Sequence, residues 1–189
     1  GNVSFYNETK SKSIDPTPVI GGIGIINDLN KVTNIKTKKS GNLIIVIGKT
    51  IGHLGQSAFL KENFSMKDGP PPEINLLNEK NNGLAVLDLI KNGIAESVHD
   101  ISSGGMLVSL AEMSMSSGLG LKINKPKKLK NIYEYFFGED QGRYLIEISK
   151  NNLKNAELFL RKNNIFYETI AEAQNDTFEI EKLFSIKTK

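Results

Sequence analysis

The chain has 189 residues, of which 39% are hydrophobic and 24% charged, so the disordered and fibrous classes are excluded. Its net charge is +3, and Arg143 and Arg161 are its only arginines, so its scattered lysines do not favour nucleic-acid binding. It has no cysteine for disulfides or thiolate chemistry, and its strongest apolar run, residues 43–47, is too short to cross a membrane. We therefore expect a cytoplasmic protein that binds neither nucleic acid nor membrane.

The first part of the chain is polar and ends at a proline-containing turn. Residues 1–15 precede Pro16 and Pro18, and we interpret them as a leftover strand and linker from a preceding domain. The main domain is then expected to span residues 16–189. It begins with a predicted strand over residues 19–26, whose glycines permit close backbone approach.

The next segments predict one buried strand and two helices. Residues 43–48 form an apolar run rich in β-branched side chains, which is typical of a central strand covered on both faces. Ser57 predicts the N-cap of a short helix that ends near Asn63. A longer helix is predicted over residues 76–92, with Gly93 at its C′ position. Its apolar residues Leu84, Leu87, Ile90 and Ile94 recur at helical spacing, which indicates one apolar face.

A strand, a glycine loop and a helix follow one another. The strand is predicted over residues 95–98, and it runs into a loop at residues 99–105. The helix after the loop is expected to reach about Ser116 and to end at Gly118. Its predicted inward residues are Leu107, Leu110 and Ala111.

The remainder of the chain contains strands around one helix. Strands are predicted over residues 119–123 and 143–148, and an amphipathic helix over residues 152–163. Residues 165–173 and 177–180 are expected to pair as a hairpin. Because these closing strands are adjacent in sequence while earlier ones are separated by helices, the predicted fold class is α+β, a mixed β-sheet layered with helices.

Three residues at the start of the chain have the chemistry of a magnesium–nucleotide site. The side-chain carbonyl of Asn2 is a hard oxygen ligand suited to Mg²⁺, and Gly1 lets a nucleotide lie against the backbone. The hydroxyl of Ser4 can bond a substrate oxygen. On spacing alone, a frayed terminal strand is the favoured interpretation.

The second candidate site is the glycine loop with His99, Asp100, Gly104 and Gly105. Its glycines and serines at a helix N-terminus can bind a phosphate, because unpaired backbone N–H groups and the helix dipole both favour an anion. The same residues suit a helix cap, and both interpretations stay open. Neighbours on a strand point to opposite faces, so a buried or orienting His99 is favoured over a catalytic pair.

The third candidate site is a glycine-bounded turn that contains Glu139, Asp140 and Gln141. Such a turn can bind ribose hydroxyls or Mg²⁺, although acidic turns are more often solvated or paired with a nearby arginine. His53 lies in a separate glycine-rich loop that lacks the Gly-Lys-Ser/Thr ending of a P-loop. No Walker-type ATP site is therefore expected.

Six motifs in a fixed order span nearly the whole chain. They are Gly1-Asn2-Val3-Ser4-Phe5-Tyr6-Asn7-Glu8, Pro16-Thr17-Pro18-Val19-Ile20-Gly21-Gly22-Ile23-Gly24, Leu54-Gly55-Gln56-Ser57, Pro70-Pro71-Pro72, His99-Asp100-Ile101-Ser102-Ser103-Gly104-Gly105 and Gly138-Glu139-Asp140-Gln141-Gly142-Arg143. Together they resemble the large synthetase component of the phosphoribosylformylglycinamidine synthase family. The opening octapeptide is the most specific motif, whereas the fifth is similar to that of aminoimidazole ribonucleotide synthetase, selenophosphate synthetase and thiamine-monophosphate kinase.

The resemblance implies a fold, a reaction and a set of partners. The family's synthetase has two pseudo-symmetric halves, each with an ATP-binding domain followed by an α/β/α domain. This chain resembles the last α/β/α domain, preceded in residues 1–15 by the tail of the second ATP-binding domain and a linker. That α/β/α domain is similar to the C-terminal domain of aminoimidazole ribonucleotide synthetase. The implied reaction converts formylglycinamide ribonucleotide, ATP and glutamine-derived ammonia to formylglycinamidine ribonucleotide, ADP and phosphate. The implied cofactors are ATP and Mg²⁺, and the implied partners are the upstream domains, a glutaminase subunit and a small accessory subunit.

The same resemblance assigns roles to residues. Gly1 would contact ATP, Asn2 would ligate Mg²⁺ and Ser4 would contact the substrate. The family's catalytic histidine and acidic metal ligands lie upstream of Gly1, so the chain alone is expected to be inactive. The turn from Glu139 to Gln141 departs from the family's substrate-binding run of an acidic residue, Ser and Gln. One alternative is therefore a non-catalytic structural domain at an auxiliary nucleotide site, and another is a related ATP-dependent synthetase or kinase.

Overall fold

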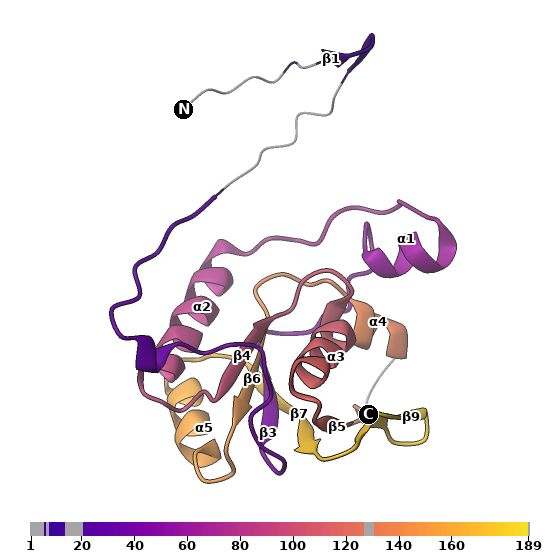
Figure 1. Cartoon of the computed structure of the whole chain (residues 1–189). Helices are drawn as coiled ribbons and strands as arrows, with labels where there is room; N and C mark the ends of the chain where they lie inside the picture. Colours follow the sequence, from indigo (N-terminus) through magenta and orange to yellow (C-terminus); the bar gives the residue numbers. More distant parts are fainter. Residues whose placement is uncertain (1–5, 7, 14–20, 127–130, 189) are drawn as a thin grey trace.

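The computed structural model of the chain describes residues 6, 8–13, 21–126 and 131–188. Its centre is a mixed seven-stranded sheet with the order β4-β6-β3-β7-β5-β8-β9, in which only β5 and β8 pair in parallel (Figure 1). These strands are β3 (Leu43–Ile47), β4 (Ser97–Asp100), β5 (Gly120–Ile123), β6 (Tyr144–Ile148), β7 (Tyr167–Gln174), β8 (Thr177–Ile180) and β9 (Phe184–Lys187). A separate antiparallel pair joins β1 (Glu8–Thr9) to β2 (Lys12–Ser13).

Helices cover both faces of the seven-stranded sheet. The helical elements are η1 (Leu29–Lys31), α1 (Ala58–Phe64), α2 (Leu76–Lys91), α3 (Gly105–Ser117), α4 (Ile132–Phe137) and α5 (Leu153–Lys162). One hydrophobic core lies under α2 and α5, and a second lies on the other face under α3 and α4 (Figure 1). The predicted α+β fold with α/β/α layers is confirmed.

The central strand β3 explains why the domain has two cores. Ile44 and Val46 belong to the core under α3 and α4, whereas Ile45 and Ile47 belong to the core under α2 and α5. Successive side chains of a strand point to opposite faces, so an uninterrupted apolar run serves both layers. Burial of each such side chain contributes roughly 1.5–3 kcal/mol.

The buried carboxylate of Glu147 binds the segment before β3 to the sheet through hydrogen bonds. Glu147 of β6 is fully buried and accepts hydrogen bonds from the backbone N–H groups of Lys38 (2.8 Å) and Lys39 (3.1 Å). It also accepts hydrogen bonds from the Asn42 amide and the Ser97 hydroxyl, both at 2.8 Å. A buried carboxylate without such donors is costly, so this network fixes the path of the chain into β3.

Several predicted elements differ from the observed ones. The strand expected over residues 19–26 is wrong in its described part, since residues 21–26 belong to no strand and are exposed. β4 begins two residues later than predicted, so His99 is a strand residue. The apolar face indicated for α2 is only partly buried, because Leu84 and Leu87 are 50% and 42% exposed. The buried residues of α2 are Asn82, Ala85, Val86 and Leu89.

The predicted hairpin of the two closing strands is wrong. β7 and β8 do not pair, because β5 lies between them, antiparallel to β7 and parallel to β8. The short connection from β7 to β8 therefore passes over Gly120, the first residue of β5. A Cβ atom on Gly120 would lie 1.9 Å from the Thr177 carbonyl oxygen, so only glycine leaves room for this crossing.

Candidate functional site

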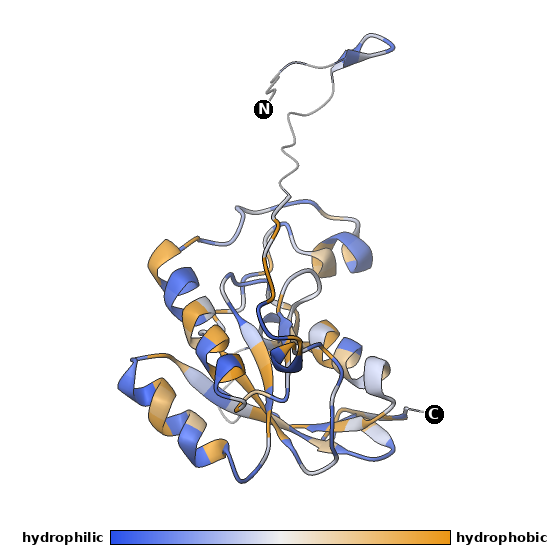
Figure 2. Ribbon diagram, turned by 60° about the vertical axis from the view of Figure 1, so that its left-hand side comes forward, coloured by the Kyte–Doolittle hydropathy of each residue, from blue (hydrophilic) through white to orange (hydrophobic). Residues whose placement is uncertain are grey.

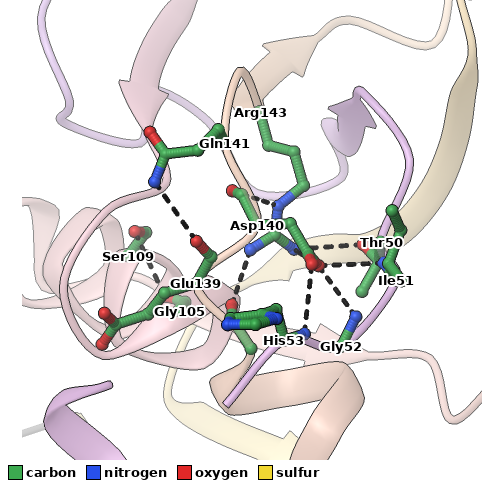
Figure 3. A network of polar contacts seen from close by, with 11 residues as sticks. Thr50, Ile51, Gly52, His53, Gly105, Ser109, Glu139, Asp140, Gln141 and Arg143 are labelled. Carbon is green, nitrogen blue, oxygen red and sulfur yellow. Dashed lines mark hydrogen bonds and ion pairs between the residues drawn. The ribbon is translucent and has the colours of Figure 1, made fainter. Parts of the chain in front are cut away.

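The turn between α4 and β6 is built around the carboxylate of Asp140. Its Oδ2 atom accepts hydrogen bonds from the backbone N–H groups of Ile51 and Gly52, both at 2.9 Å, and its Oδ1 atom accepts one from His53 at 3.1 Å (Figure 3). Asp140 is buried. The turn residue therefore holds the glycine-rich loop at residues 48–55 in place through its backbone.

Arg143 supports the same turn from inside the domain. Its side chain is buried, and it donates hydrogen bonds to the carbonyl oxygens of Asp140 (3.0 Å) and Gly138 (2.6 Å) and to the Thr50 hydroxyl (3.1 Å) (Figure 3). Its Nη1 atom also lies 3.8 Å from Asp140 Oδ2. Burial lowers the pKa of the guanidinium, and the Asp140 carboxylate opposes that shift. The buried positive charge of Arg143 and the buried negative charge of Asp140 therefore compensate each other.

Glu139 links two helix starts. Its Oε1 atom accepts hydrogen bonds from the backbone N–H groups of Ala58 (2.8 Å), the first residue of α1, and of Gly104 (2.7 Å), the N-cap of α3. A helix N-terminus favours an anion, and in this structure the anion at α3 is the protein's own carboxylate. Gln141 is exposed and makes one long contact of 3.5 Å to the Glu139 carbonyl oxygen.

Two glycines stand at the start of α3, Gly104 as its N-cap and Gly105 as its first residue. Gly104 has a φ of +84° and Gly105 has a φ of +71°, a backbone region that favours glycine. A Cβ atom on Gly105 would lie 2.6 Å from the Phe137 carbonyl carbon and 2.7 Å from the Gly138 oxygen. The Gly105 N–H donates to the Ser102 oxygen at 3.0 Å. The glycine loop thus packs tightly against the acidic turn.

His99 lies between two carboxylates. Its Nε2 atom is 2.7 Å from Glu112 Oε2 on α3, and its Nδ1 atom is 3.3 Å from Asp100 Oδ1. The Asp100 backbone oxygen accepts a hydrogen bond from Ser109 at 3.2 Å. These contacts orient the imidazole between β4 and α3, and Glu112 is a partner that the sequence analysis did not identify.

A cleft of about 370 Å³ opens beside the acidic turn. It is lined by two predicted site residues, Asp140 and Gln141, and by His53, to which the sequence assigned no role. The His53 Nε2 atom lies 2.9 Å from the Pro70 oxygen. Sequence reasoning missed the other polar lining residues, which are Lys49, Glu73, Asn75, Asn78, Glu79, Asn82 and Asn164. The sequence carried a signal for part of this set, because Asn78, Glu79 and Asn82 recur at helical spacing within α2.

The first predicted site cannot be placed, because Gly1, Asn2 and Ser4 lie outside the described residues. Within the described ranges, no group of three or more His, Cys, Asp or Glu residues could hold a metal ion. The search of these ranges for a helix long and apolar enough to span a membrane found none.

The fold and the sequence together define the class of the domain. Residues 39–182 match the family described as AIR synthase related protein, C-terminal domain, and the chain belongs to that family. This result confirms the resemblance indicated by the sequence motifs.

Curated relatives narrow the comparison to one kind of synthetase. The chain is 47% identical over 93% of its length to the phosphoribosylformylglycinamidine synthase subunit PurL of Pelagibacter ubique, of which it covers 24%. It is 41% identical over 98% of its length to the PurL subunit of Bartonella bacilliformis, of which it covers 25%. The chain thus spans about a quarter of the length of these relatives.

Solved structures show the same fold at low sequence identity. PurL of Thermotoga maritima complexed with FGAR is 18% identical, with a TM-score of 0.68 over 85% of this chain and 29% of that one. The hydrogenase maturation protein HypE of E. coli is 16% identical, with a TM-score of 0.58 over 82% of this chain and 51% of that one. Both likenesses concern the fold alone.

Proposed function

We propose that this chain is the C-terminal part of an ATP-dependent carbon–nitrogen ligase, phosphoribosylformylglycinamidine synthase. The full-length protein would convert formylglycinamide ribonucleotide, ATP and glutamine-derived ammonia to formylglycinamidine ribonucleotide, ADP and phosphate. The observation that carries this proposal is the 47% identity to a PurL subunit across 93% of the chain. Fold neighbours that are PurL complexes with ATP and with FGAR support it.

The proposed chemistry converts a poor leaving group into a good one. ATP transfers its γ-phosphoryl group to the amide oxygen of the substrate, ammonia attacks the amide carbon, and phosphate leaves with that oxygen. Mg²⁺ would neutralise the charge of the phosphoryl group during transfer. An asparagine amide oxygen fits a magnesium ion, and we propose that Asn2 ligates it, Gly1 contacts ATP and Ser4 contacts the substrate.

The described residues support a narrower role for the acidic turn and the glycine loop. Glu139 and Asp140 use their carboxylates on backbone N–H groups of the domain itself. His99 has a carboxylate near each ring nitrogen. Among the residues expected to contact a phosphate or ribose, Gln141 has an exposed side chain at the cleft. We therefore propose Gln141 as the contact with a ligand and the others as supports.

The remaining proposals concern boundaries and partners. We propose that residues 1–15 end a preceding ATP-binding domain and that residues 16–189 form the C-terminal domain, in a cytoplasmic protein. The partners would be the upstream domains, a glutaminase subunit and a small accessory subunit. A fold neighbour is PurLQS from Thermotoga maritima, which supports an assembly of this kind.

Substitution of Asn2 in the full-length protein tests the magnesium assignment. Asn2→Ala should lower kcat/KM at least about tenfold and raise the Mg²⁺ concentration needed for half-maximal rate, because a metal ligand is lost. Asn7→Ala is the matched control from the same motif and should change neither quantity. An Asn2→Ala enzyme with full rate and an unchanged Mg²⁺ requirement would remove Asn2 from the site.

A non-catalytic scaffold is the second candidate, and the internal use of Glu139, Asp140 and Arg143 favours it for this domain. Gly105→Glu would place a side chain against the backbone of Phe137 and Gly138. If the domain is a scaffold, this variant should lower the stability or the assembly of the protein, and turnover per assembled complex should stay unchanged. A loss of turnover in fully assembled complexes would contradict it.

A further inference from the structure

A second cleft, of about 440 Å³, opens at the ends of three strands of the sheet. It lies where the parallel strands β5 and β8 reach their carboxyl ends and β7 begins, and Tyr135 of α4 also lines it. It shares no lining residue with the cleft beside the acidic turn. Its volume falls within the roughly 300–1,000 Å³ of small-molecule sites, so it is a separate candidate for a small ligand.

Charged side chains of both signs line this second cleft. Lys122 and Lys125 bring positive charge, and Glu168 and Glu181 bring negative charge. Hydrophilic residues like these interrupt the apolar strands near the C-terminus, where Figure 2 shows blue segments beside orange ones. A ligand with charge of only one sign is repelled by half of these groups, whereas a zwitterion can turn each charge toward its opposite.

Two of these charged groups are left without an ion pair. Among the residues that the structure describes, Lys125 and Glu168 take part in no ion pair. Lys122, by contrast, lies opposite Glu179 on the neighbouring strand β8. The carboxylate of Glu181 lies 3.7 Å from the ammonium group of the next residue. Lys125 and Glu168 are therefore the charges that remain for a ligand.

Tyr135 distinguishes this cleft from an ordinary solvated surface. The residue is 8% exposed, and its hydroxyl oxygen is buried without a hydrogen-bond partner among the described residues. Burial and, after it, the charge of Glu168 raise the pKa of this hydroxyl, so the two side chains lie near one another in the cleft wall. A buried hydroxyl without a partner costs free energy, which a ligand that bonds to it would recover.

Asn124 completes a set of three acceptors. Its backbone N–H donates to the Ile170 oxygen at 2.7 Å, and its side-chain amide donates to the Thr169 oxygen at 3.3 Å, which fixes its position after β5. Its side-chain oxygen is an acceptor that faces no donor among the described residues. An ammonium group has three N–H donors, and the cleft offers it the Glu168 carboxylate, the Tyr135 oxygen and the Asn124 oxygen.

We propose that this cleft binds a small zwitterion of the amino-acid class. The ammonium group of the ligand donates to Glu168, Tyr135 and Asn124, and its carboxylate pairs with Lys125. Glu168 is exposed, so its side chain can rotate and admit the ammonium group to the hydroxyl. The inference is independent of the proposed function, which uses none of these four residues.

Titration of the 189-residue chain with L-serine and L-glutamine tests the proposal, because each carries one ammonium, one carboxylate and no further charge. Isothermal titration calorimetry should give one site per chain for at least one of them, with a Kd below about 1 mM. Succinate and putrescine, which carry charge of one sign only, should bind at least about tenfold more weakly. No binding of either amino acid up to about 10 mM, or equal affinity for succinate or putrescine, would overturn the proposal.

NMR of the isotope-labelled chain locates the site. The backbone amide signals of Asn124 and Lys125 should shift as the amino acid saturates the chain, and the signal of Asp140 in the other cleft should not. Shifts confined to the acidic turn would overturn the proposal, because the ligand would then occupy the first cleft.

Two variants and a control separate a built site from general charge. Glu168→Gln keeps the size of the side chain but removes its charge, and it should weaken binding at least about tenfold. Tyr135→Phe removes only the hydroxyl and should weaken binding about threefold to tenfold. Glu62→Gln is the control, since Glu62 is an exposed residue of α1 outside the cleft, and it should bind like the parent. Unchanged affinity in either cleft variant, or an equal loss in the control, would overturn the proposal.

Discussion

Asp140 is the residue on which the shape of the glycine-rich loop depends. Its carboxylate accepts three backbone hydrogen bonds and faces the buried Arg143. Asp140→Ala removes the acceptor and leaves a buried guanidinium without its counter-charge. We expect the free energy of unfolding to fall by about 2–4 kcal/mol, measured by urea unfolding of the 189-residue chain.

Gln141 provides the control for that measurement. It is the next residue in the same turn, its side chain is exposed, and its one contact is 3.5 Å long. Gln141→Ala should therefore change the free energy of unfolding by less than about 0.5 kcal/mol. Equal losses in the two variants would show that the turn matters through its backbone and not through the Asp140 carboxylate.

The buried Tyr135 should make the stability of the folded protein depend on pH. Its hydroxyl is buried and has no hydrogen-bond partner among the described residues. Burial, assisted by the Glu168 carboxylate, raises the pKa of Tyr135 above its ordinary value. Above about pH 10 the unfolded chain loses this proton while the folded protein keeps it, so stability falls as pH rises, by at most about 1.4 kcal/mol per pH unit.

Tyr135→Phe removes the titrating group and tests this sign. The variant should differ from the parent by less than about 1 kcal/mol at neutral pH, because no hydrogen bond is lost. Urea unfolding near pH 7, 9 and 11 should show the parent losing stability relative to the variant above about pH 10. A constant difference across this range would contradict the assigned cause.

Sequence reasoning recovered part of the site at this scale. Pairing of the acidic turn with Arg143 was a stated alternative, because the two lie three residues apart. The bond from Glu139 to the Gly104 N–H joins residues 35 positions apart, and such a contact depends on how α3 and α4 pack. The same holds for His99 and Glu112, whose proximity follows from the packing of α3 against β4.

At the scale of elements, the crossing of the β7–β8 connection over β5 depends on Gly120. A methyl group there would collide with the Thr177 backbone, which is 1.9 Å from the Cβ position. Gly120→Ala should therefore lower the free energy of unfolding by about 2–4 kcal/mol, as strain from overpacking at a fixed backbone position. Thermal or urea unfolding of the 189-residue chain measures it.

Gly83 is the matched glycine for this experiment. It lies inside α2, and a Cβ atom there would meet only the Tyr144 hydroxyl at an ordinary 3.6 Å. Gly83→Ala should stabilise the protein by about 0.5–1 kcal/mol, because alanine is the better helix former. If both variants lose stability alike, the crossing at Gly120 is not the cause.

The elements themselves were predictable where one local signal dominated. The apolar run of β3, the Ser57 N-cap and Gly118 at the end of α3 were all predicted correctly. The hairpin was wrong because adjacency in sequence favours pairing, whereas here a distant strand, β5, enters between β7 and β8. The apolar face of α2 did not mark its buried side, because its periodic leucines are exposed, and Ala85, Val86 and Leu89 fill the core instead.

At the scale of the whole molecule, the chain is a folded domain in which the carboxylates of the predicted acidic turn bond to backbone groups of the same domain. The acidic turn holds the glycine-rich loop and the starts of α1 and α3, and the described residues contain no metal-binding group. The chain covers about a quarter of its synthetase relatives. We propose that the reacting groups lie in the rest of the full-length protein.

The most direct test measures ADP and formylglycinamidine ribonucleotide formed from formylglycinamide ribonucleotide, ATP and ammonium. The full-length protein and the 189-residue chain are assayed side by side at equal concentration with Mg²⁺. Our account predicts turnover by the full-length protein and none above background by the chain alone. Turnover by the chain alone, or none by a correctly folded full-length protein, would contradict it.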